Sequence, residues 1–361
     1  MRIGVLGGGQ LGRMLALAGY PLGLRFRFFD PHPESPAGHL AELVTGAYDD
    51  VDALAYFGAG CDLITYEFEN VPFDAVQYLT RYAPVYPPPE ALAVAQDRLR
   101  EKETFTRLGI PTPVFDPVDS RVELNHAVER FGLPAVLKTR RFGYDGKGQQ
   151  VLRTRADVAA AWEALQGSPL LFEGFIPFER ELSLVAVRGR EGQTAFYPLV
   201  ENWHEQGILR RTLAPAPQVA PELQQEAERH LTLLMETLNY VGVLTVEFFQ
   251  HEGRLIANEM APRVHNSGHW TIEGAVTSQF ENHLRAICGL PLGVTATRGS
   301  AGMINLIGTT PAPEKVLEVP GAHLHLYGKQ PRAGRKLGHI TVVASDPRTL
   351  EERLQAIQAC L

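Results

Sequence analysis

The sequence is poor in cysteine: Cys61, Cys288 and Cys360 are the three cysteines among 361 residues. They are widely spaced and form no C-x-x-C pair, which argues against a disulfide framework and against a cysteine-based zinc site. Scattered free thiols of this kind are typical of a reducing compartment. We therefore expect a cytoplasmic protein without structural disulfides.

Long hydrophobic runs and an excess of positive charge are missing as well. No stretch approaches the roughly 18 uninterrupted apolar residues of a membrane-spanning helix. The first apolar run, residues 3–6, is cut short by a glycine cluster, so no secretory leader is expected. The net charge is −7 and the isoelectric point is near 6.0, which leaves no electrostatic footprint for nucleic acid. We expect neither a membrane nor a nucleic-acid partner.

Apolar residues are plentiful enough to form large cores. They make up 45% of the chain, against 21% charged residues, a balance typical of a soluble globular enzyme. With 361 residues the chain exceeds the usual size of a single hydrophobic core. The sequence therefore predicts two or three domains.

A glycine-rich turn follows the first apolar run, in the stretch IGVLGGGQLGRM. Gly7, Gly9 and Gly12 match the pattern G-x-G-x-x-G, and Asp30 ends the next apolar run. Dinucleotide-binding folds place glycines and a ribose-binding acid in this order. An NAD-dependent oxidoreductase is therefore one hypothesis, although it depends on one weak motif. The alternative is a Rossmann-like turn with a different ligand, in which Asp30 caps the turn that follows it.

The remaining chain alternates between helix and strand signals. Strand and helix patterns alternate over residues 1–95, which predicts a parallel sheet with ligands at the carboxyl ends of its strands. The proline-rich stretch 84–92 indicates a stiff connector at a domain boundary. We expect one helix over 90–109, another near 221–238 and a final one near 347–359.

A lysine at a strand end precedes a second glycine-rich loop, in VLKTRRFGYDGKGQQ. Lys138 terminates the apolar run, and Gly143, Gly146 and Gly148 follow. Glycines allow main-chain amides to approach phosphate oxygens, and a strand-end lysine neutralises their charge. The loop is not a Walker A motif, because the G-K-[ST] ending is missing. The alternative is a mobile hairpin with an exposed lysine.

Two acids lie in a predicted hairpin, TVEFFQHEGRLIANEM. A three-residue loop with Gly253 at positive φ places Glu247 opposite Ala257 and Glu259 opposite Thr245. The two carboxylates then project from one face as diagonal neighbours, within reach of one or two hard cations. Because an unpaired carboxylate is costly to bury, Mg²⁺ is one hypothesis. A salt-bridged or solvent-facing acid is the other.

Two further segments concentrate polar and basic side chains. NEMAPRVHNSGHW, residues 258–270, follows the second acid directly and carries Arg263, His265 and Asn266. Its position beside a candidate metal site indicates substrate and phosphate contacts. YGKQPRAGRKLGH, residues 327–339, is a glycine-rich loop with four cations, typical either of a phosphate monoester site or of a solvated loop. These cations are Lys329, Arg332, Arg335 and Lys336.

In this order, these pieces resemble the ATP-grasp superfamily, and more narrowly its N5-carboxyaminoimidazole ribonucleotide synthetase family. The resemblance runs nearly end to end through GGGQLGRM, GYDGKGQ, NWHEQGILR, NEMAPRVHNSGHW, QFENHLRAI and GKQPRAGRKLGH. It implies a mixed α/β and α+β fold. A Rossmann-like pre-ATP-grasp domain would span residues 1–98, and an ATP-grasp region would span 99–292. That region would comprise a flap subdomain at about 110–175 and a metal-binding sheet at about 176–292, before a β-rich subdomain at 293–361 that carries the substrate-phosphate loop.

The resemblance also assigns roles to individual residues. ATP would contact Arg98, Lys138, Gly143, Tyr144, Asp145, Gly146, Lys147, Gly148, Gln149, Glu173, Gly174, Phe175, Ile176, Glu181, His204, Asn258 and Glu259. Aminoimidazole ribonucleotide would contact Gln10, Leu11, Glu67, Tyr144, His265, Asn266, Lys329, Arg335 and Lys336. Catalysis would involve Asp145, Tyr144, Arg263 and Lys336, and Glu247 and Glu259 would hold Mg²⁺.

Two of these assignments depart from a simple match to the family. Either Glu179 or Glu181 suits the ribose contact, and Glu181 is favoured because the family keeps an acid two positions before the serine, here Ser183. Lys147 stands where the family commonly has arginine, and a lysine does not make the same bidentate contact.

The implied reaction is an ATP- and bicarbonate-dependent carboxylation of the ribonucleotide through carboxyphosphate, by a homodimer. One or two Mg²⁺ ions would assist, with Mn²⁺ as an acceptable substitute. The alternatives are a formate-dependent glycinamide ribonucleotide transformylase of the same superfamily, the NAD-dependent oxidoreductase, and a nucleotide-binding regulator without activity. The last is disfavoured because Lys138 and both metal acids are present.

Overall fold

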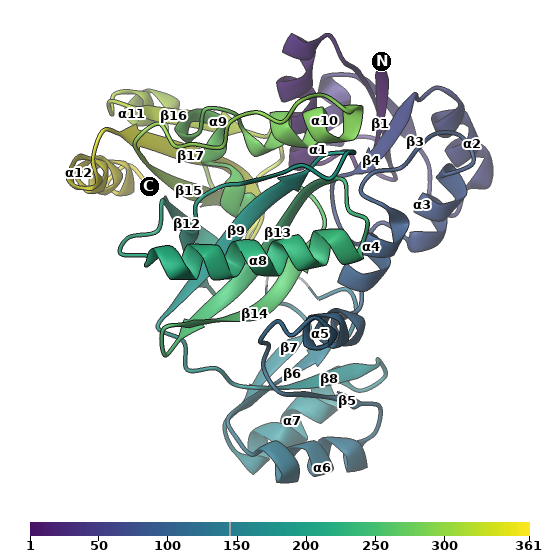
Figure 1. Ribbon diagram of the computed structural model, residues 1–361, viewed down its shortest axis with the longest axis vertical. Coiled ribbons are helices and arrows are strands. Elements are labelled where there is room, and N and C mark those ends of the chain that lie inside the picture. The colour runs from purple at the N-terminus through teal and green to yellow at the C-terminus, as the bar shows by residue number, and fades with distance from the viewer. Residues whose placement is uncertain (144–145) are drawn as a thin grey trace.

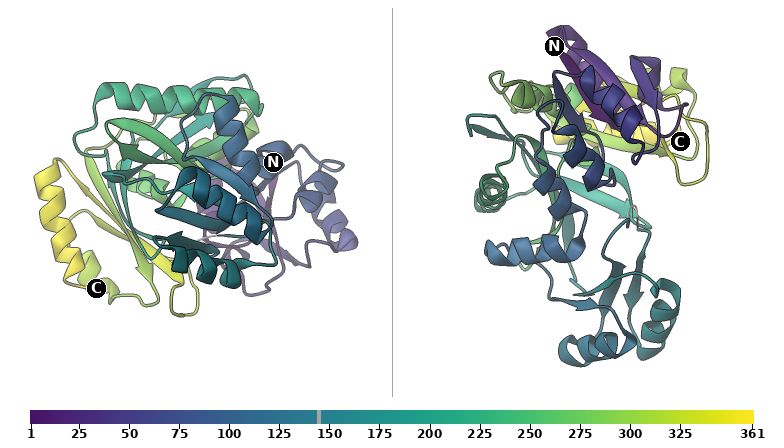
Figure 2. Two further views of the ribbon diagram at one scale, coloured as in Figure 1. Left: turned by 90° about the horizontal axis from the view of Figure 1, so that it is seen from below. Right: turned by 90° about the vertical axis from the view of Figure 1, so that its right-hand side faces the viewer.

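A computed structural model describes residues 1–143 and 146–361 of the chain. The described residues form three sheets (Figure 1). One four-stranded sheet lies near the N-terminus, a second four-stranded sheet forms a separate lobe, and a nine-stranded sheet lies in the middle of the molecule. The two further views show that the small lobe projects away from the other two sheets (Figure 2). Within the described residues, no helix has both the length and the apolar composition needed to cross a membrane.

The N-terminal sheet is parallel throughout, in the order β3-β2-β1-β4, as the alternating sequence pattern predicts. Its strands are β1 (Arg2–Leu6), β2 (Arg25–Asp30), β3 (Glu42–Thr45) and β4 (Leu63–Tyr66). The helices of this part are α1 (Gln10–Gly19), α2 (Val51–Ala59) and α3 (Phe73–Leu79), with short 3₁₀ turns at Tyr20–Leu22 and Pro36–His39. The glycine turn lies between β1 and α1, at the carboxyl end of the central strands.

The helix predicted over residues 90–109 is in fact two helices, α4 (Pro89–Ala95) and α5 (Arg98–Arg107). The break has a local cause. The side chain of Asp97 accepts a hydrogen bond from the amide of Leu99 at 3.1 Å and so starts α5 as its N-cap. Short side chains with an oxygen favour this position because they satisfy one of the unpaired amides of the first turn.

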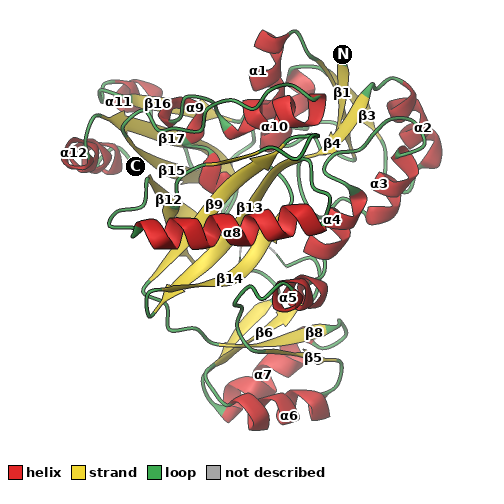
Figure 3. Ribbon diagram, viewed as in Figure 1, coloured by secondary structure: helices red, strands yellow, loops and turns green. Residues whose placement is uncertain are grey.

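The small lobe is an antiparallel sheet in the order β5-β8-β6-β7, covered on one face by two helices (Figure 3). Its elements are β5 (Phe115–Val118), α6 (Arg121–Phe131), β6 (Ala135–Thr139), β7 (Gln149–Leu152), α7 (Arg155–Leu165) and β8 (Leu170–Gly174). Both helices begin with a capping box, at Ser120 and Thr154. The glycine-rich loop connects β6 to β7 at one end of this lobe.

The nine-stranded sheet runs in the order β14-β13-β9-β11-β12-β15-β17-β16, with β10 paired to β9. Its strands are β9 (Arg180–Arg188), β10 (Thr194–Phe196), β11 (Val200–Glu205), β12 (Ile208–Ala214), β13 (Gly242–His251), β14 (Arg254–Ala261), β15 (Ser300–Ile307), β16 (Ala322–Leu326) and β17 (Lys336–Ala344). The associated helices are α8 (Pro221–Thr237), α9 (Thr271–Gly274), α10 (Gln279–Cys288), α11 (Pro313–Leu317) and α12 (Pro347–Gln358), with a 3₁₀ turn at Asn266–Gly268. Because β15 pairs with β12, the strands after residue 293 continue the sheet that begins before it. Helix α8 lies across one face of this sheet (Figure 1).

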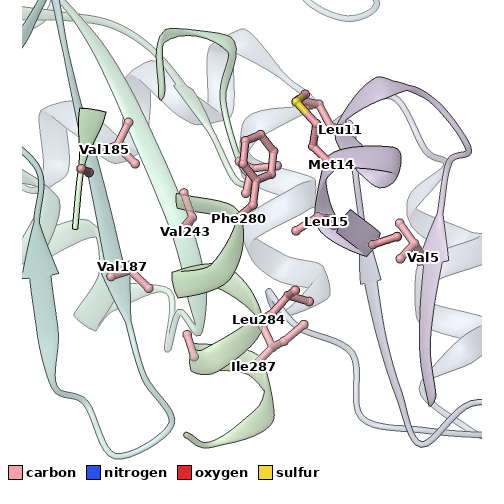
Figure 4. Close-up of a cluster of buried hydrophobic side chains, with 14 of the residues drawn as sticks. Val5, Leu11, Met14, Leu15, Val185, Val187, Val243, Phe280, Leu284 and Ile287 are labelled. Atoms are coloured by element: carbon pink, nitrogen blue, oxygen red, sulfur yellow. The ribbon is translucent and has the colours of Figure 1, made fainter. Parts of the chain in front are cut away.

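A shared hydrophobic core joins the N-terminal sheet to the large sheet. Leu11 and Met14 of α1 lie opposite Phe280 and Leu284 of α10, which in turn lies beside Val243 of β13 (Figure 4). Burying a side chain of this size contributes about 1.5–3 kcal/mol, so the packing fixes α1 firmly against the large sheet. The glycine turn at the start of α1 is thereby held at a defined distance from β13.

Candidate active site

A cavity of about 760 Å³ lies where the glycine turn, α5, the small lobe and the large sheet meet. Most of the residues that the sequence assigned to ligands line it. These are Gln10, Leu11, Arg98, Lys138, Gly143, Gly146, Lys147, Gln149, Glu173, Gly174, Phe175, Ile176, Glu181, His204, Glu247, Asn258, Glu259, Arg263, His265, Asn266 and Lys336. Tyr144 and Asp145 lie outside the described residues. The structure therefore brings residues from every part of the chain to one cavity.

The two predicted metal acids lie directly opposite each other, not diagonally as the sequence register predicted. Glu247 pairs with Glu259, and a bulge shifts the register between Glu247 and the next residue. The predicted three-residue loop is wrong, because Glu252 and Gly253 both adopt positive φ, at 50° and 72°, and form a two-residue turn. Such turns match the twist of the flanking strands. The extra residue in the bulge, Asn258, then restores both acids to one face.

The two carboxylates differ in their electrostatic surroundings. Burial and the neighbouring Glu259 raise the pKa of Glu247 to about 7. Burial alone would also raise the pKa of Glu259, but Arg98 lowers it to about 2. The Arg98 guanidinium donates to the Glu259 carboxylate at 2.9 Å. Glu259 is therefore ionised at neutral pH, whereas Glu247 titrates near neutrality.

The donor set at this position fits a hard divalent cation. Two carboxylates face each other, and the side-chain oxygen Oδ1 of Asn258 is buried with no hydrogen-bond partner among the described residues. Carboxylate and amide oxygens are the ligands that Mg²⁺ prefers, together with water and substrate phosphates. Glu247, Glu259 and Asn258 are thus the residues suited to hold Mg²⁺ or Mn²⁺.

The strand-end lysine and the glycine-rich loop face the same cavity. Lys138 of β6 is 7% exposed, and its ammonium donates to the Glu173 carboxylate on the adjacent strand at 2.8 Å. Gly146 and Gly148 have φ values of 75° and 72°, which L residues with side chains rarely adopt. A β-carbon on Gly148 would also lie 2.6 Å from the hydroxyl of Thr139. The loop after β6 therefore needs these glycines for its conformation and for its close packing.

One of the two alternative ribose acids faces the cavity. Glu181 lines it and lies 2.7 Å from Nδ1 of His204. Glu179 instead accepts a hydrogen bond from the amide of Glu252 in the hairpin turn. Burial alone would lower the pKa of His204, but the hydrogen bond to Glu181 and the nearby charge of Glu247 raise it to about 9. His204 is therefore a cation at neutral pH.

The polar segment after β14 also faces the cavity. Arg263 forms a partly buried ion pair with Glu69, in the loop that follows β4. Nε2 of His265 lies 3.4 Å from the Glu247 carboxylate. Burial lowers the pKa of His265 well below its usual range, and the charge of Arg263 adds to this effect, so the imidazole is neutral. This segment places a fixed cation and a neutral histidine beside the two acids.

Comparison with known proteins identifies the family. The chain matches models of a ribonucleotide synthetase preATP-grasp domain over residues 1–96, an ATP-grasp domain over 103–280 and a phosphoribosylaminoimidazole carboxylase C-terminal domain over 301–353. A curated N5-carboxyaminoimidazole ribonucleotide synthase from Pseudomonas aeruginosa is 52% identical over 361 residues, covering 100% of this chain and 99% of that protein. The chain belongs to the N5-carboxyaminoimidazole ribonucleotide synthase family. The resemblance indicated by the sequence motifs is confirmed.

Solved structures of this family share the whole fold. The crystal structure of N5-carboxyaminoimidazole ribonucleotide synthetase from Thermus thermophilus has a TM-score of 0.96 and 59% identity, covering 99% of this chain and 98% of that one. The N5-carboxyaminoimidazole synthase from Aspergillus clavatus, solved in complex with ADP and 5-aminoimidazole ribonucleotide, has a TM-score of 0.91 and 32% identity. That match covers 99% of this chain and 97% of the Aspergillus chain. The chain is therefore an ATP-grasp ligase with a pre-ATP-grasp and a C-terminal domain, as the sequence predicted.

The glycine turn has a different role in this synthase than in a dehydrogenase. The amides of Gly9 and Gly12, at the start of α1, donate to the carboxylate of Glu67, the latter at 2.5 Å. Asp30 accepts from the amides of Gly8 at 2.7 Å and His32 at 2.8 Å, so it caps the turn. The positions that a dinucleotide would use for its pyrophosphate and ribose are thus filled by side chains of the chain itself. The NAD hypothesis has no support in this arrangement.

A few predicted ligand residues lie outside the cavity wall. Glu67 is 6% exposed and holds the glycine turn, and burial raises its pKa. Lys329 donates to the side chain of Gln10, so the basic loop reaches the glycine turn across the interface between domains. Arg335 donates to the carbonyl of Gln330 within its own loop at 3.2 Å. Gly148 is not part of the wall either, because it packs against β6.

Sequence reasoning missed several charged residues at the site. Glu69 is two positions after Glu67 in the sequence, and its ion pair with Arg263 connects segments far apart in the chain. Glu101 accepts from the amide of Met260, the residue after Glu259, at 2.6 Å. The charged sequence of α5, RLREKETFTR, is typical of a solvent-exposed helix. One face of α5 is nevertheless buried, and no pattern within the helix predicts this burial.

Proposed function

We propose that this synthase carboxylates the exocyclic amine of 5-aminoimidazole ribonucleotide, using ATP and bicarbonate, to give N5-carboxyaminoimidazole ribonucleotide, ADP and phosphate in purine synthesis. The observation that carries the proposal is the opposed pair Glu247 and Glu259, in one cavity with Lys138 and with Gln10 of the glycine turn. The complex of the Aspergillus relative with ADP and 5-aminoimidazole ribonucleotide supports it.

In the first step, a bicarbonate oxygen attacks the γ-phosphorus of ATP, and ADP leaves as carboxyphosphate forms. Phosphoryl transfer needs positioning and charge neutralisation more than covalent help from the protein. Lys138 and Arg98 bring positive charge to the polyphosphate side of the cavity, and the loop between β6 and β7 offers main-chain amides. Glu247 and Glu259 would hold Mg²⁺, which would supply neutralisation of phosphate charge.

One part of the cavity wall suits the adenosine part of ATP. Glu173 to Ile176, at the end of β8, line the cavity and offer main-chain groups to the adenine edge. Glu181 and His204 form the next part of the wall and suit the ribose hydroxyls, since a carboxylate accepts and an imidazolium donates.

In the second step, the amine nitrogen attacks the carboxyl carbon, phosphate leaves, and the nitrogen loses a proton. Arg263 is placed beside the acids and suits the developing negative charge. His265, Asn266, Lys336, Gln10 and Leu11 would enclose the ribonucleotide, with Lys329 and Arg335 at its phosphate. Asp145 is assigned to orienting bicarbonate or the amine, and an unchanged kcat in Asp145→Asn would contradict that role.

Water must be kept from carboxyphosphate, because hydrolysis competes with the amine. Closure of the loop between β6 and β7 over both ligands supplies this protection. We further propose that the active enzyme is a cytoplasmic homodimer, as the family resemblance implies.

The test is ADP release by the purified protein with and without the ribonucleotide, in bicarbonate-containing and bicarbonate-free buffer. We expect turnover only when both are present. Stimulation by formate and glycinamide ribonucleotide instead would indicate the transformylase reaction, and no substrate-dependent turnover would contradict both.

A further inference from the structure

Lys102 is a buried cation for which the proposed reaction provides no role. It lies on α5, one turn after Arg98, and its side chain is 0% exposed. Its ammonium donates to the main-chain carbonyls of Asn258 at 2.6 Å and Ala257 at 3.4 Å. It also lies 3.7 Å from the carboxylate of Glu173. Because an ammonium is costly to bury without partners, this set of acceptors fixes Lys102 in place.

Glu173 consequently lies between two lysines. Its Oε2 accepts from Lys138 at 2.8 Å and lies 3.7 Å from Lys102. Its other oxygen, Oε1, is buried and has no hydrogen-bond partner among the described residues. The carboxylate therefore retains an acceptor for one ammonium when the other moves away.

The two lysines differ in what they can reach. Lys138 lines the cavity. Among the described residues, Lys102 is not part of the cavity wall; it lies behind that wall and is bound to the backbone of β14. Of the two, Lys138 is thus the lysine that faces an incoming phosphate. A movement of Lys138 toward the phosphate lengthens its 2.8 Å contact with Glu173.

We propose that Lys102 is a positioning residue that frees Lys138 for the nucleotide phosphates by remaining the permanent counter-ion of Glu173. This inference depends on the proposed function, since ATP is the ligand toward which Lys138 is directed. If Lys138 were the sole partner of Glu173, its departure would leave a buried carboxylate unpaired, which is strongly unfavourable. With Lys102 in place, the pair left behind remains neutral.

The charge state of Glu173 agrees with this role. Burial alone would raise its pKa, but Lys102 and Lys138 lower it to about 2. The carboxylate is therefore ionised at neutral pH and competes with phosphate for Lys138 unless a second cation balances it.

The decisive experiment measures ADP affinity by titration calorimetry on the full-length protein. Lys102→Met should weaken ADP binding roughly tenfold, which corresponds to about 1.4 kcal/mol. The KM for the ribonucleotide should stay unchanged. The double variant Lys102→Met/Glu173→Gln removes the competing carboxylate and should recover most of the lost affinity. Lys315→Met, at an exposed position on α11, is the matched control.

Several outcomes would overturn the proposal. Wild-type ADP affinity in Lys102→Met, or a double variant as weak as the single one, would show that Lys102 does not act through Glu173. If Lys102→Met does not fold, Glu173→Gln alone decides: the proposal requires ADP binding at least as tight as in the wild type, and weaker binding contradicts it. Failure of the proposed function is a separate observation, because it appears as missing ribonucleotide-dependent turnover in the wild type.

Discussion

Glu247 of β13 lies directly opposite Glu259 of β14, and this pairing exists because a bulge moves the register by one residue. In the same two-residue hairpin without the bulge, Glu247 would lie opposite Asn258, and the two acids would project from opposite faces of the sheet. With it, two oxygen-rich groups face each other beside the buried amide oxygen of Asn258. The edge of the sheet thereby presents a donor set suited to a divalent cation, in the wall of the cavity that Lys138 also lines.

Removing one of these acids should impair catalysis far more than folding. We expect Glu247→Gln to lower kcat roughly 100-fold, by analogy with the loss of other electrostatic stabilisers of charged transition states. The Mg²⁺ concentration for half-maximal ADP release should rise as well. The measurement is ADP release across a Mg²⁺ titration, with Glu191→Gln, an exposed turn position, as control. Unchanged Mg²⁺ dependence would show that Glu247 does not hold the metal.

The ion pair of His204 with Glu181 predicts a pH dependence of stability. The pKa of His204 is raised from 6.5 to about 9 in the folded protein. A raised pKa gives a stabilisation that is complete below the unfolded value and is lost as pH rises through about 9. The experiment measures the free energy of unfolding at pH 7 and at pH 9.5, with EDTA and without nucleotide. Between these two pH values the wild type should lose roughly 1–3 kcal/mol more of this free energy than His204→Gln loses. Parallel pH profiles from urea denaturation would contradict the assignment.

The contact of Gly9 with Glu67 predicts a steric cost. Gly9 has φ −79° and ψ −161°, which an alanine adopts without strain. A β-carbon there would lie 2.5 Å from Oε1 of Glu67. Gly9→Ala should therefore lower the free energy of unfolding by about 1–3 kcal/mol, as overpacking does elsewhere. Urea denaturation measures the loss, and the shorter side chain in Gly9→Ala/Glu67→Asp should restore part of it. A fully stable Gly9→Ala would mean that Glu67 does not occupy the turn.

Much of the fold follows from local sequence signals. The alternation of strand and helix patterns before residue 95 predicts the parallel sheet that the structure shows. The hairpin and the positive φ of Gly253 are also local features. Periodicity and turn chemistry are encoded within a few residues, so they can be read without tertiary information.

The features that sequence reasoning missed depend on contacts between distant segments. The bulge at Asn258 leaves no mark in the apolar pattern, because one inserted residue restores the original face. Lys102 appears among charged neighbours on a helix, and its burial comes from β14, far along the chain. Glu67 accepts from two amides of α1, and this contact between distant segments cannot be read from the sequence around Glu67. The break before α5 is different, since Asp97 is a favourable N-cap that the sequence already displays.

The basic loop of residues 329–336 provides the sharpest test of the substrate side. In the part of the chain that the structure describes, the hydrogen bonds of the Arg335 side chain stay within its own loop. Its guanidinium can therefore turn toward a phosphate monoester without breaking a buried ion pair. Arg335→Gln should raise the KM for the ribonucleotide roughly 10- to 100-fold, the range expected for a lost hydrogen bond to a charged group. The KM for ATP should stay the same, because the residues proposed to contact ATP all lie outside this loop. Arg348→Gln, an exposed position on α12, is the control for a change in surface charge. If the dephosphorylated nucleoside loses as much activity in the variant as the ribonucleotide does, Arg335 does not bind the phosphate.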